Sequence, residues 1–165
     1  MPHNITALIL KGDIDLAKAA DFDLVPIDLG FGLTLFHING YYSLYWQYKL
    51  GTSGELDIVD PSTYYTFPAD MSVAAIAKSI SASDEPDFAI IQTDYFGGMG
   101  DQHACVFRGA ENADRAITMI SPALRYLGVT ARQGLDEFDT VGLDKIRSSP
   151  DHLSKYSELV RGFED

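Results

Sequence analysis

The segment 29–50 constrains the fold of this chain more than any other stretch, because apolar residues alternate with mixed ones on both sides of Asn39-Gly40. Asn-Gly is the dipeptide that best fits a two-residue type I′ hairpin turn, in which both central residues have positive φ. With the turn here, one face of the hairpin is apolar, and a slip of one residue would invert both strands. The pattern therefore predicts an antiparallel hairpin over 29–50 and a sheet as the scaffold.

Other local patterns predict further elements. Aliphatic residues at 5–10 predict a first strand, and helical apolar spacing behind the capping residue Asp70 predicts a helix over 71–81. Two extended patterns around the glycine-containing loop 97–102 predict a second hairpin over 88–108.

The remaining segments are read in the same way. A short strand or an aromatic-anchored loop is expected at 63–67, and a long helix over 112–127 that Pro122 kinks or interrupts. The acidic, glycine-spaced segment 129–144 is expected to be a loop. A capping pattern at Ser149-Pro150-Asp151 predicts a last helix that begins there.

The chain has 165 residues, of which 46% are apolar, and this is enough to bury one core without disulfide bonds. No internal repeat, linker or low-complexity tract divides it. We therefore expect a single α+β domain over 1–165. Its sheet would be mainly antiparallel, built from the hairpins 29–50 and 88–108, with helices packed on one face.

The chain has one cysteine, Cys105, which excludes an intrachain disulfide bond and favours a reducing compartment. The N-terminal residues lack the basic region and apolar run of a signal peptide. No apolar run approaches the roughly 20 residues that span a bilayer. A cytoplasmic location without membrane contact is the expectation.

The net charge of −12 is unevenly distributed along the chain. Residues 1–100 carry 13 acidic side chains and four lysines without an arginine, whereas residues 101–165 carry 11 acidic and eight basic side chains. Because phosphate binding needs clustered Lys and Arg, nucleic acid is disfavoured as a ligand, and so is an anionic membrane. The charge either serves solubility alone or forms an acidic face for a basic protein partner.

The glycines of the loop 97–102 would let backbone amides approach a ligand closely. A phosphate-binding loop would need a following Gly-Lys-Ser/Thr, and a dinucleotide fingerprint would need a helix after the glycines, but neither is present. The loop is therefore either a hairpin connection with positive φ or an exposed recognition loop. In the second case the contact residues would be Asp94, Gly97, Gly98, Gly100, Asp101 and Gln102.

His103 and Cys105 lie two residues apart, on the same face of an expected strand. Both are metal-ligand types, but no second cysteine pair or His-x₃-His accompanies them, so we expect no metal and no cofactor. A mid-strand cysteine lacks the helix N-terminus that usually activates a catalytic thiol, and Cys105 is interpreted as a small buried hydrophobe. His103 is kept as a candidate binding residue. A hydrolase or transferase would use it with Asp94 or Asp101.

Five aromatic residues crowd the segment 41–48. In strand geometry, Tyr41 and Tyr45 point away from the core, above the smooth patch of Gly30 and Gly32. Tyrosines placed in this way contact either a second structural layer or a protein partner, and tyrosine is enriched at interfaces. Both are therefore candidate binding residues.

The run Thr93-Asp-Tyr-Phe-Gly-Gly-Met-Gly-Asp-Gln102, followed by a strand of small residues, resembles a recurring feature of small bacterial proteins. Those proteins are largely uncharacterised, and some of them are immunity proteins of toxin systems. The resemblance covers this segment alone. It implies a binding role and assigns no catalytic residue.

Together these features favour a non-enzymatic, acidic protein-binding module, such as an immunity or inhibitor protein that masks a basic toxin or enzyme. One alternative is a small-molecule binding protein with a pocket between sheet and helices. A second, with fewer residues to support it, is the hydrolase or transferase that would use His103. An exposed edge strand or the tyrosine-bearing face would permit a homodimer, but the sequence selects no oligomeric state.

Overall fold

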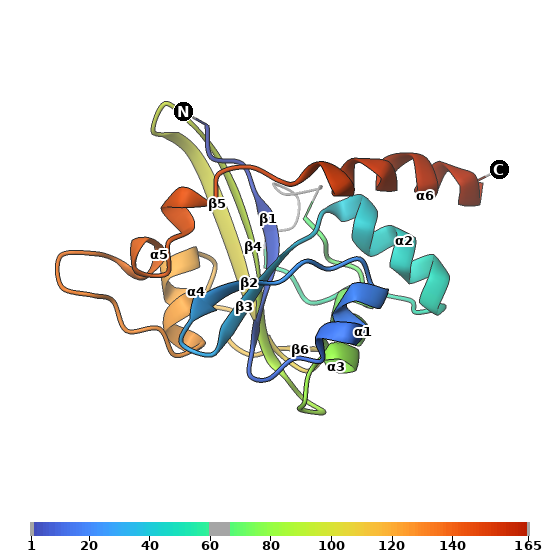
Figure 1. Ribbon diagram of the computed structural model, residues 1–165, viewed down its shortest axis with the longest axis horizontal. Helices are drawn as coiled ribbons and strands as arrows, with labels where there is room; N and C mark the ends of the chain where they lie inside the picture. Colours follow the sequence, from blue (N-terminus) through green and yellow to red (C-terminus); the bar gives the residue numbers. More distant parts are fainter. Residues whose placement is uncertain (1, 60–66, 165) are drawn as a thin grey trace.

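The computed structural model describes residues 2–59 and 67–164. The strands of this part form one six-stranded antiparallel sheet in the order β2-β3-β1-β4-β5-β6 (Figure 1). Their bounds are β1 Thr6–Lys11, β2 Ile27–Gly30, β3 Leu33–His37, β4 Asp87–Phe96, β5 Met99–Arg108 and β6 Glu111–Asn112.

The helices lie on both faces of the sheet. Figure 1 shows α1, α2, α3 and α6 on one side and α4 and α5 on the other. The α-helices are α1 Leu16–Asp21, α2 Gly40–Leu50, α3 Ser72–Ile80, α4 Ile120–Tyr126, α5 Glu137–Thr140 and α6 Tyr156–Glu164. The 3₁₀ helices η2 Leu143–Lys145 and η3 Asp151–Lys155 lie between α5 and α6. The predicted α+β class is confirmed.

The expectation of helices on one face is wrong, because the central strand β1 is apolar on both faces. Leu8 and Leu10 pack into a core with α1, α2, α3 and α6. Ala7 and Ile9 pack into a second core with α4 and the segment after it. Strand side chains alternate between faces, so a strand that buries every residue needs a layer on each side.

The predicted hairpin over 29–50 is wrong beyond residue 37. The chain turns earlier, at Phe31 and Gly32, which both have positive φ, and it joins β2 to β3. Asn39 has extended backbone dihedrals, and its side-chain oxygen accepts a hydrogen bond from the backbone N–H of Tyr42 at 2.7 Å. It therefore caps helix α2, because asparagine serves helix N-termini as well as hairpin turns.

Most other expected elements are confirmed, with shifted ends. Residues 5–10 form most of β1, residues 71–81 contain α3, and the hairpin 88–108 is the β4–β5 pair. The last helical segment follows Pro150 as expected, first as η3 and then as α6. The segment 63–67 lies outside the described residues, except for the buried Phe67.

The long helix expected over 112–127 is replaced by a strand, a loop and a short helix. Asn112 belongs to β6, which pairs with the end of β5. Helix α4 begins only at Ile120, and Pro122 lies in its first turn, where a missing N–H costs nothing. The expected loop 129–144 also contains the short helix α5.

A hydrogen bond and an ion pair to Asp23 connect the start of the C-terminal helix α6 to the segment between α1 and β2. The Tyr156 hydroxyl donates to Asp23 Oδ2 at 2.6 Å, and Lys155 Nζ lies 2.8 Å from the same oxygen. The Tyr156 ring also packs edge-on against Tyr42, with centroids 5.1 Å apart. Burial acts to raise the pKa of Asp23, but the hydrogen bonds from Lys155 and Tyr156 outweigh it and leave the pKa below its ordinary value.

Replacing the cap of α2 tests the corrected assignment of residues 39–50. Asn39→Ala removes the hydrogen bond to the Tyr42 N–H, and we expect it to lower the free energy of unfolding by about 1 kcal/mol. Asn39→Asp keeps a cap oxygen and should remain close to the wild type. Urea unfolding followed by circular dichroism measures both variants. Equal losses in the two would contradict the capping role.

The contact between Tyr156 and Asp23 predicts a pH-dependent mutational effect. Tyr156→Phe should lower the free energy of unfolding by about 1–2 kcal/mol at neutral pH, because a hydrogen bond to a carboxylate is lost. A carboxyl group whose pKa is lower in the folded protein than in the unfolded chain stabilises the folded state at pH values above its unfolded pKa of about 3.9. This contribution disappears as the pH falls through the pKa of the folded state. The effect of Tyr156→Phe should therefore shrink in acid.

Urea unfolding at neutral pH and near pH 3 measures this, with the exposed Tyr41→Phe as the control. A loss of the same size at both pH values would contradict the role of Asp23.

Candidate functional site

The candidate site is the end of the β4–β5 hairpin, which we call the hairpin tip and define as residues 94–101. It extends past the helices next to the N-terminus (Figure 1). Gly97 and Gly98, with φ of 59° and 80°, form a two-residue turn, and Phe96 pairs with Met99 across it. The expected six-residue loop 97–102 is therefore wrong, since residues 99–102 belong to β5.

Gly100 has a packing reason to be glycine. A Cβ atom at this position would collide with the backbone carbonyl oxygen of Asp94 on the opposite strand. The glycines of the tip thus allow the turn and the close approach of its two strands. No ligand is needed to account for them.

Matched substitutions test these roles. Gly100→Ala forces the strands of the tip apart and should lower the free energy of unfolding by about 2 kcal/mol, in the range of overpacked cores. Gly97→Asn recreates the favoured Asn-Gly turn and should leave stability nearly unchanged. Urea unfolding measures both, and a Gly100→Ala protein as stable as the Gly97→Asn protein would contradict the steric argument.

The hairpin tip combines exposed apolar and acidic side chains on one face. Phe96 is 76% exposed and Met99 is 80% exposed, which is unusual for side chains of this size. Asp94 and Asp101 are also exposed and face each other directly in the register. Because side chains alternate between the two faces of a strand, all four point to the same face of the hairpin. This is also the face of Ile90, which lies closer to the start of β4.

A cavity of about 290 Å³ lies beside the tip, on its other face. Its lining includes Gly98 and Gln102 of the hairpin and, from distant segments, Asp136 and Arg147. The pKa of nearby Asp139 is raised by partial burial and by the charges of Asp136 and Asp144. Of the cavity's lining residues, Asp136 contributes a carboxylate and Arg147 a guanidinium group.

The Gln102 side chain links the hairpin to helix α4 through hydrogen bonds. Its side-chain N–H donates to the Tyr95 hydroxyl at 3.1 Å, and its side-chain oxygen accepts from the backbone N–H of Ile120 at 2.8 Å. Both ends of the amide are thus used within the protein. Gln102, which the sequence offered as a contact residue, lines the cavity and also has a structural role.

His103 is buried below the tip. Its Nε2 atom lies 3.4 Å from Cys105 Sγ, and its ring meets Phe67 edge-on at 5.2 Å between centroids. Burial raises the pKa of the Cys105 thiol to about 11, so the thiolate needed for nucleophilic attack is scarce at neutral pH.

Tyr41 and Tyr45 lie in helix α2, far from the hairpin tip (Figure 1). Tyr41 is exposed, but Tyr45 packs edge-on against Trp46 and Tyr156, each at 5.2 Å between centroids. The expected strand face with both tyrosines above Gly30 and Gly32 is therefore wrong. The predicted binding residues therefore fall into two separate groups. One lies in the hairpin tip and the adjoining residues 102–103 of β5, and the other, Tyr41 and Tyr45, lies in helix α2.

Sequence reasoning missed His3, which is buried at the base of the hairpin. Its Nε2–H donates to the Leu143 carbonyl at 2.8 Å, and its Nδ1 lies 2.7 Å from the Thr93 hydroxyl. Thr93 in turn accepts the backbone N–H of Ile5 at 3.0 Å. These contacts span 90 and 140 residues of sequence, and no local pattern announces them.

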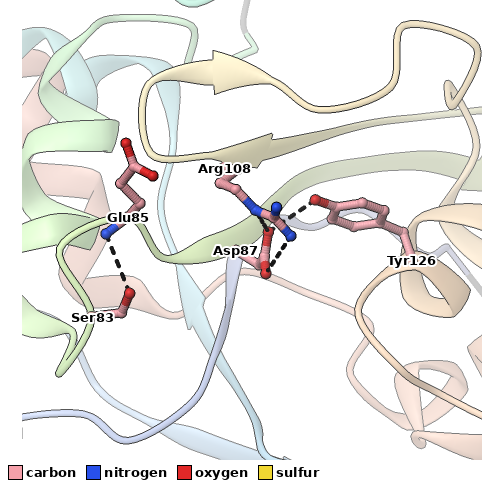
Figure 2. Close-up of polar contacts among 5 residues, drawn as sticks. All are labelled: Ser83, Glu85, Asp87, Arg108 and Tyr126. Atoms are coloured by element: carbon pink, nitrogen blue, oxygen red, sulfur yellow. Dashed lines mark hydrogen bonds and ion pairs between the residues drawn. The ribbon is translucent and has the colours of Figure 1, made fainter.

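A second polar cluster lies at the opposite end of the hairpin (Figure 2). There Asp87 Oδ1 accepts from Arg108 Nε at 3.1 Å and from the Tyr126 hydroxyl at 2.9 Å. Arg108 and Tyr126 also line an open cavity of about 610 Å³ with Glu85. Because Asp87 and Arg108 form an ion pair within the cluster, we interpret these contacts as structural ones that link β4, β5 and α4.

Comparisons with protein-family models, curated proteins and solved structures gave no match. In residues 2–59 and 67–164, no helix is both long and apolar enough to cross a bilayer. The same residues hold no group of three or more His, Cys, Asp or Glu side chains that could bind one metal ion.

Proposed function

We propose that this chain is a non-enzymatic protein-binding module whose hairpin tip docks on a basic partner protein. The observation that carries the proposal is the combination at the tip of two exposed apolar side chains, Phe96 and Met99, with the exposed Asp94 and Asp101. Apolar anchors surrounded by charge are the usual composition of a protein interface.

The charge of the tip favours a cationic partner. Like charges directly opposite in a strand pair destabilise the hairpin, and Asp94 and Asp101 form such a pair. A Lys or Arg of the partner placed between them would remove this repulsion on binding. The net charge of −12 would in addition attract a basic protein over a distance and speed its association.

The class of partner follows from the earlier resemblance. The segment 93–102, which resembles a feature of proteins that include toxin-system immunity proteins, contains the whole hairpin tip. A basic toxin or enzyme that this chain masks is therefore the partner we propose.

A small-molecule binding protein is the second candidate. It is favoured by the cavity of about 290 Å³ beside the tip, where the opposite charges of Asp136 and Arg147 and the Gln102 amide line one space. A ligand there would have to be small and polar.

Affinity capture from an extract of the producing cells tests the proposed function, with identification of the captured protein. Asp94→Lys with Asp101→Lys should weaken binding of that protein about tenfold or more, which corresponds to about 1.4 kcal/mol. The control is Asp13→Lys with Asp84→Lys, which makes the same change of net charge on exposed residues at the other end of the sheet. It should retain most of the binding.

Phe96→Ser with Met99→Ser should also abolish capture, whereas about 0.5 M salt should weaken capture by the wild type. The proposal fails if the partner binds the tip variants as tightly as it binds the wild type, or if the captured protein is acidic.

A further inference from the structure

Two histidines from distant parts of the chain lie where the segment before α6 passes the end of the β2–β3 pair. His37 ends strand β3, and His152 lies in η3. Both line a cavity of about 280 Å³, together with Ile27 and residues 148–150. We call residues 148–152 the crossing segment, and this segment therefore lies against His37.

The surroundings of His37 suit a neutral imidazole ring and oppose a charged one. The side chain is only 8% exposed, and its Nδ1 atom is buried without a hydrogen-bond partner in the described part of the protein. A proton bound at this atom would have no acceptor there, and a buried charge without a partner is more costly than a neutral polar atom. The Nε2 atom of His152 is buried and unpaired in the same way.

The elements packed against His37 add to this effect. Its partner in β1 is Ala7, and the apolar Val25 and Ile27 line the shared cavity. Burial lowers the pKa of His37, and the positive charge that His152 can carry lowers it further. The uncharged ring is therefore the form that the folded protein stabilises.

The nearby carboxylates do not compensate a charge on His37. Asp23 is close enough for its charge to interact with that of His152, but its carboxylate is already bonded to Lys155 and Tyr156. Asp151, beside His152 in the sequence, is exposed to solvent. Neither carboxylate is among the groups that act on His37.

The crossing segment is held at both ends by contacts that do not involve a histidine. Before it, the Arg147 carbonyl accepts the backbone N–H of Asn4 at 2.9 Å. After it, the Leu153 carbonyl accepts the side-chain N–H of Asn39 at 3.4 Å. The segment can therefore separate from the sheet as a local opening while both ends stay attached.

We propose that His37 and His152 make this contact sensitive to pH, so that the crossing segment separates from the end of β3 in mildly acidic solution. A histidine whose pKa is lower in the closed state than in the opened one favours the opened state as the pH falls below its ordinary pKa of about 6.5. Above that value the His37 ring is neutral and the closed contact is stable. Helix α6 stays in place in this range, because the lowered pKa of Asp23 keeps its contacts with Lys155 and Tyr156 intact.

Amide NMR spectra of the full chain, recorded between about pH 7.5 and pH 5, test the proposal on both sides of the ordinary histidine pKa. We expect the signals of residues 148–152 and of His37 to change together below about pH 6.5, while those of β4 and α6 keep their folded positions. His152→Gln removes the like charge and should move this transition to lower pH by about half a unit or more. The double variant His37→Gln with His152→Gln should show no transition.

His103→Gln, which removes another buried histidine, is the matched control and should keep the transition. Circular dichroism at neutral pH establishes which variants fold. If the double variant does not fold, His152→Gln decides the question, because His152 is partly exposed. The proposal is overturned if the wild-type signals of residues 148–152 do not change, if they change at the same pH in folded His152→Gln, or if the whole spectrum changes at once. None of these results bears on the hairpin tip.

Discussion

The burial of β1 on both faces is the constraint on which the rest of this structure depends. Its residues from Thr6 to Leu10 are all buried, and it pairs with β3 on one side and β4 on the other. Such a strand is stable only inside a sheet that is covered twice, so helices must pack on both faces. The hairpin tip is exposed because β4 and β5 continue past β1, whose last pair joins Thr6 to Gln92.

Sequence reasoning located the elements with strong local patterns and failed where one pattern fits two structures. Asn39 is favourable in a hairpin turn and at a helix N-terminus, and the aromatic run after it is compatible with either. Tertiary packing made the choice, because Leu35 of β3 is paired with Ile9 and Ile27 and has no edge left for a third strand. The alternation read over 29–50 contained no information about these partners.

The candidate site was predictable only in the part that has a strong local sequence pattern. The glycine-rich run between two apolar strands identified the hairpin tip, and its register follows from the turn at Gly97-Gly98. The hydrogen bond between His3 and the Leu143 carbonyl joins residues more than a hundred positions apart, and His3 looks isolated in its own segment. Periodicity and spacing report neighbours within one element, so contacts of this kind become visible only in three dimensions.

The hydrogen bond between His3 and the Leu143 carbonyl affects the order in which the protein folds. A contact between residues 3 and 143 cannot form until most of the chain has left the ribosome. Closing so long a loop is entropically costly, and topologies rich in distant pairings fold slowly. The base of the hairpin is therefore among the last regions to become rigid, and a nascent chain would acquire the stem of β4 and β5 before the position of the hairpin tip is fixed.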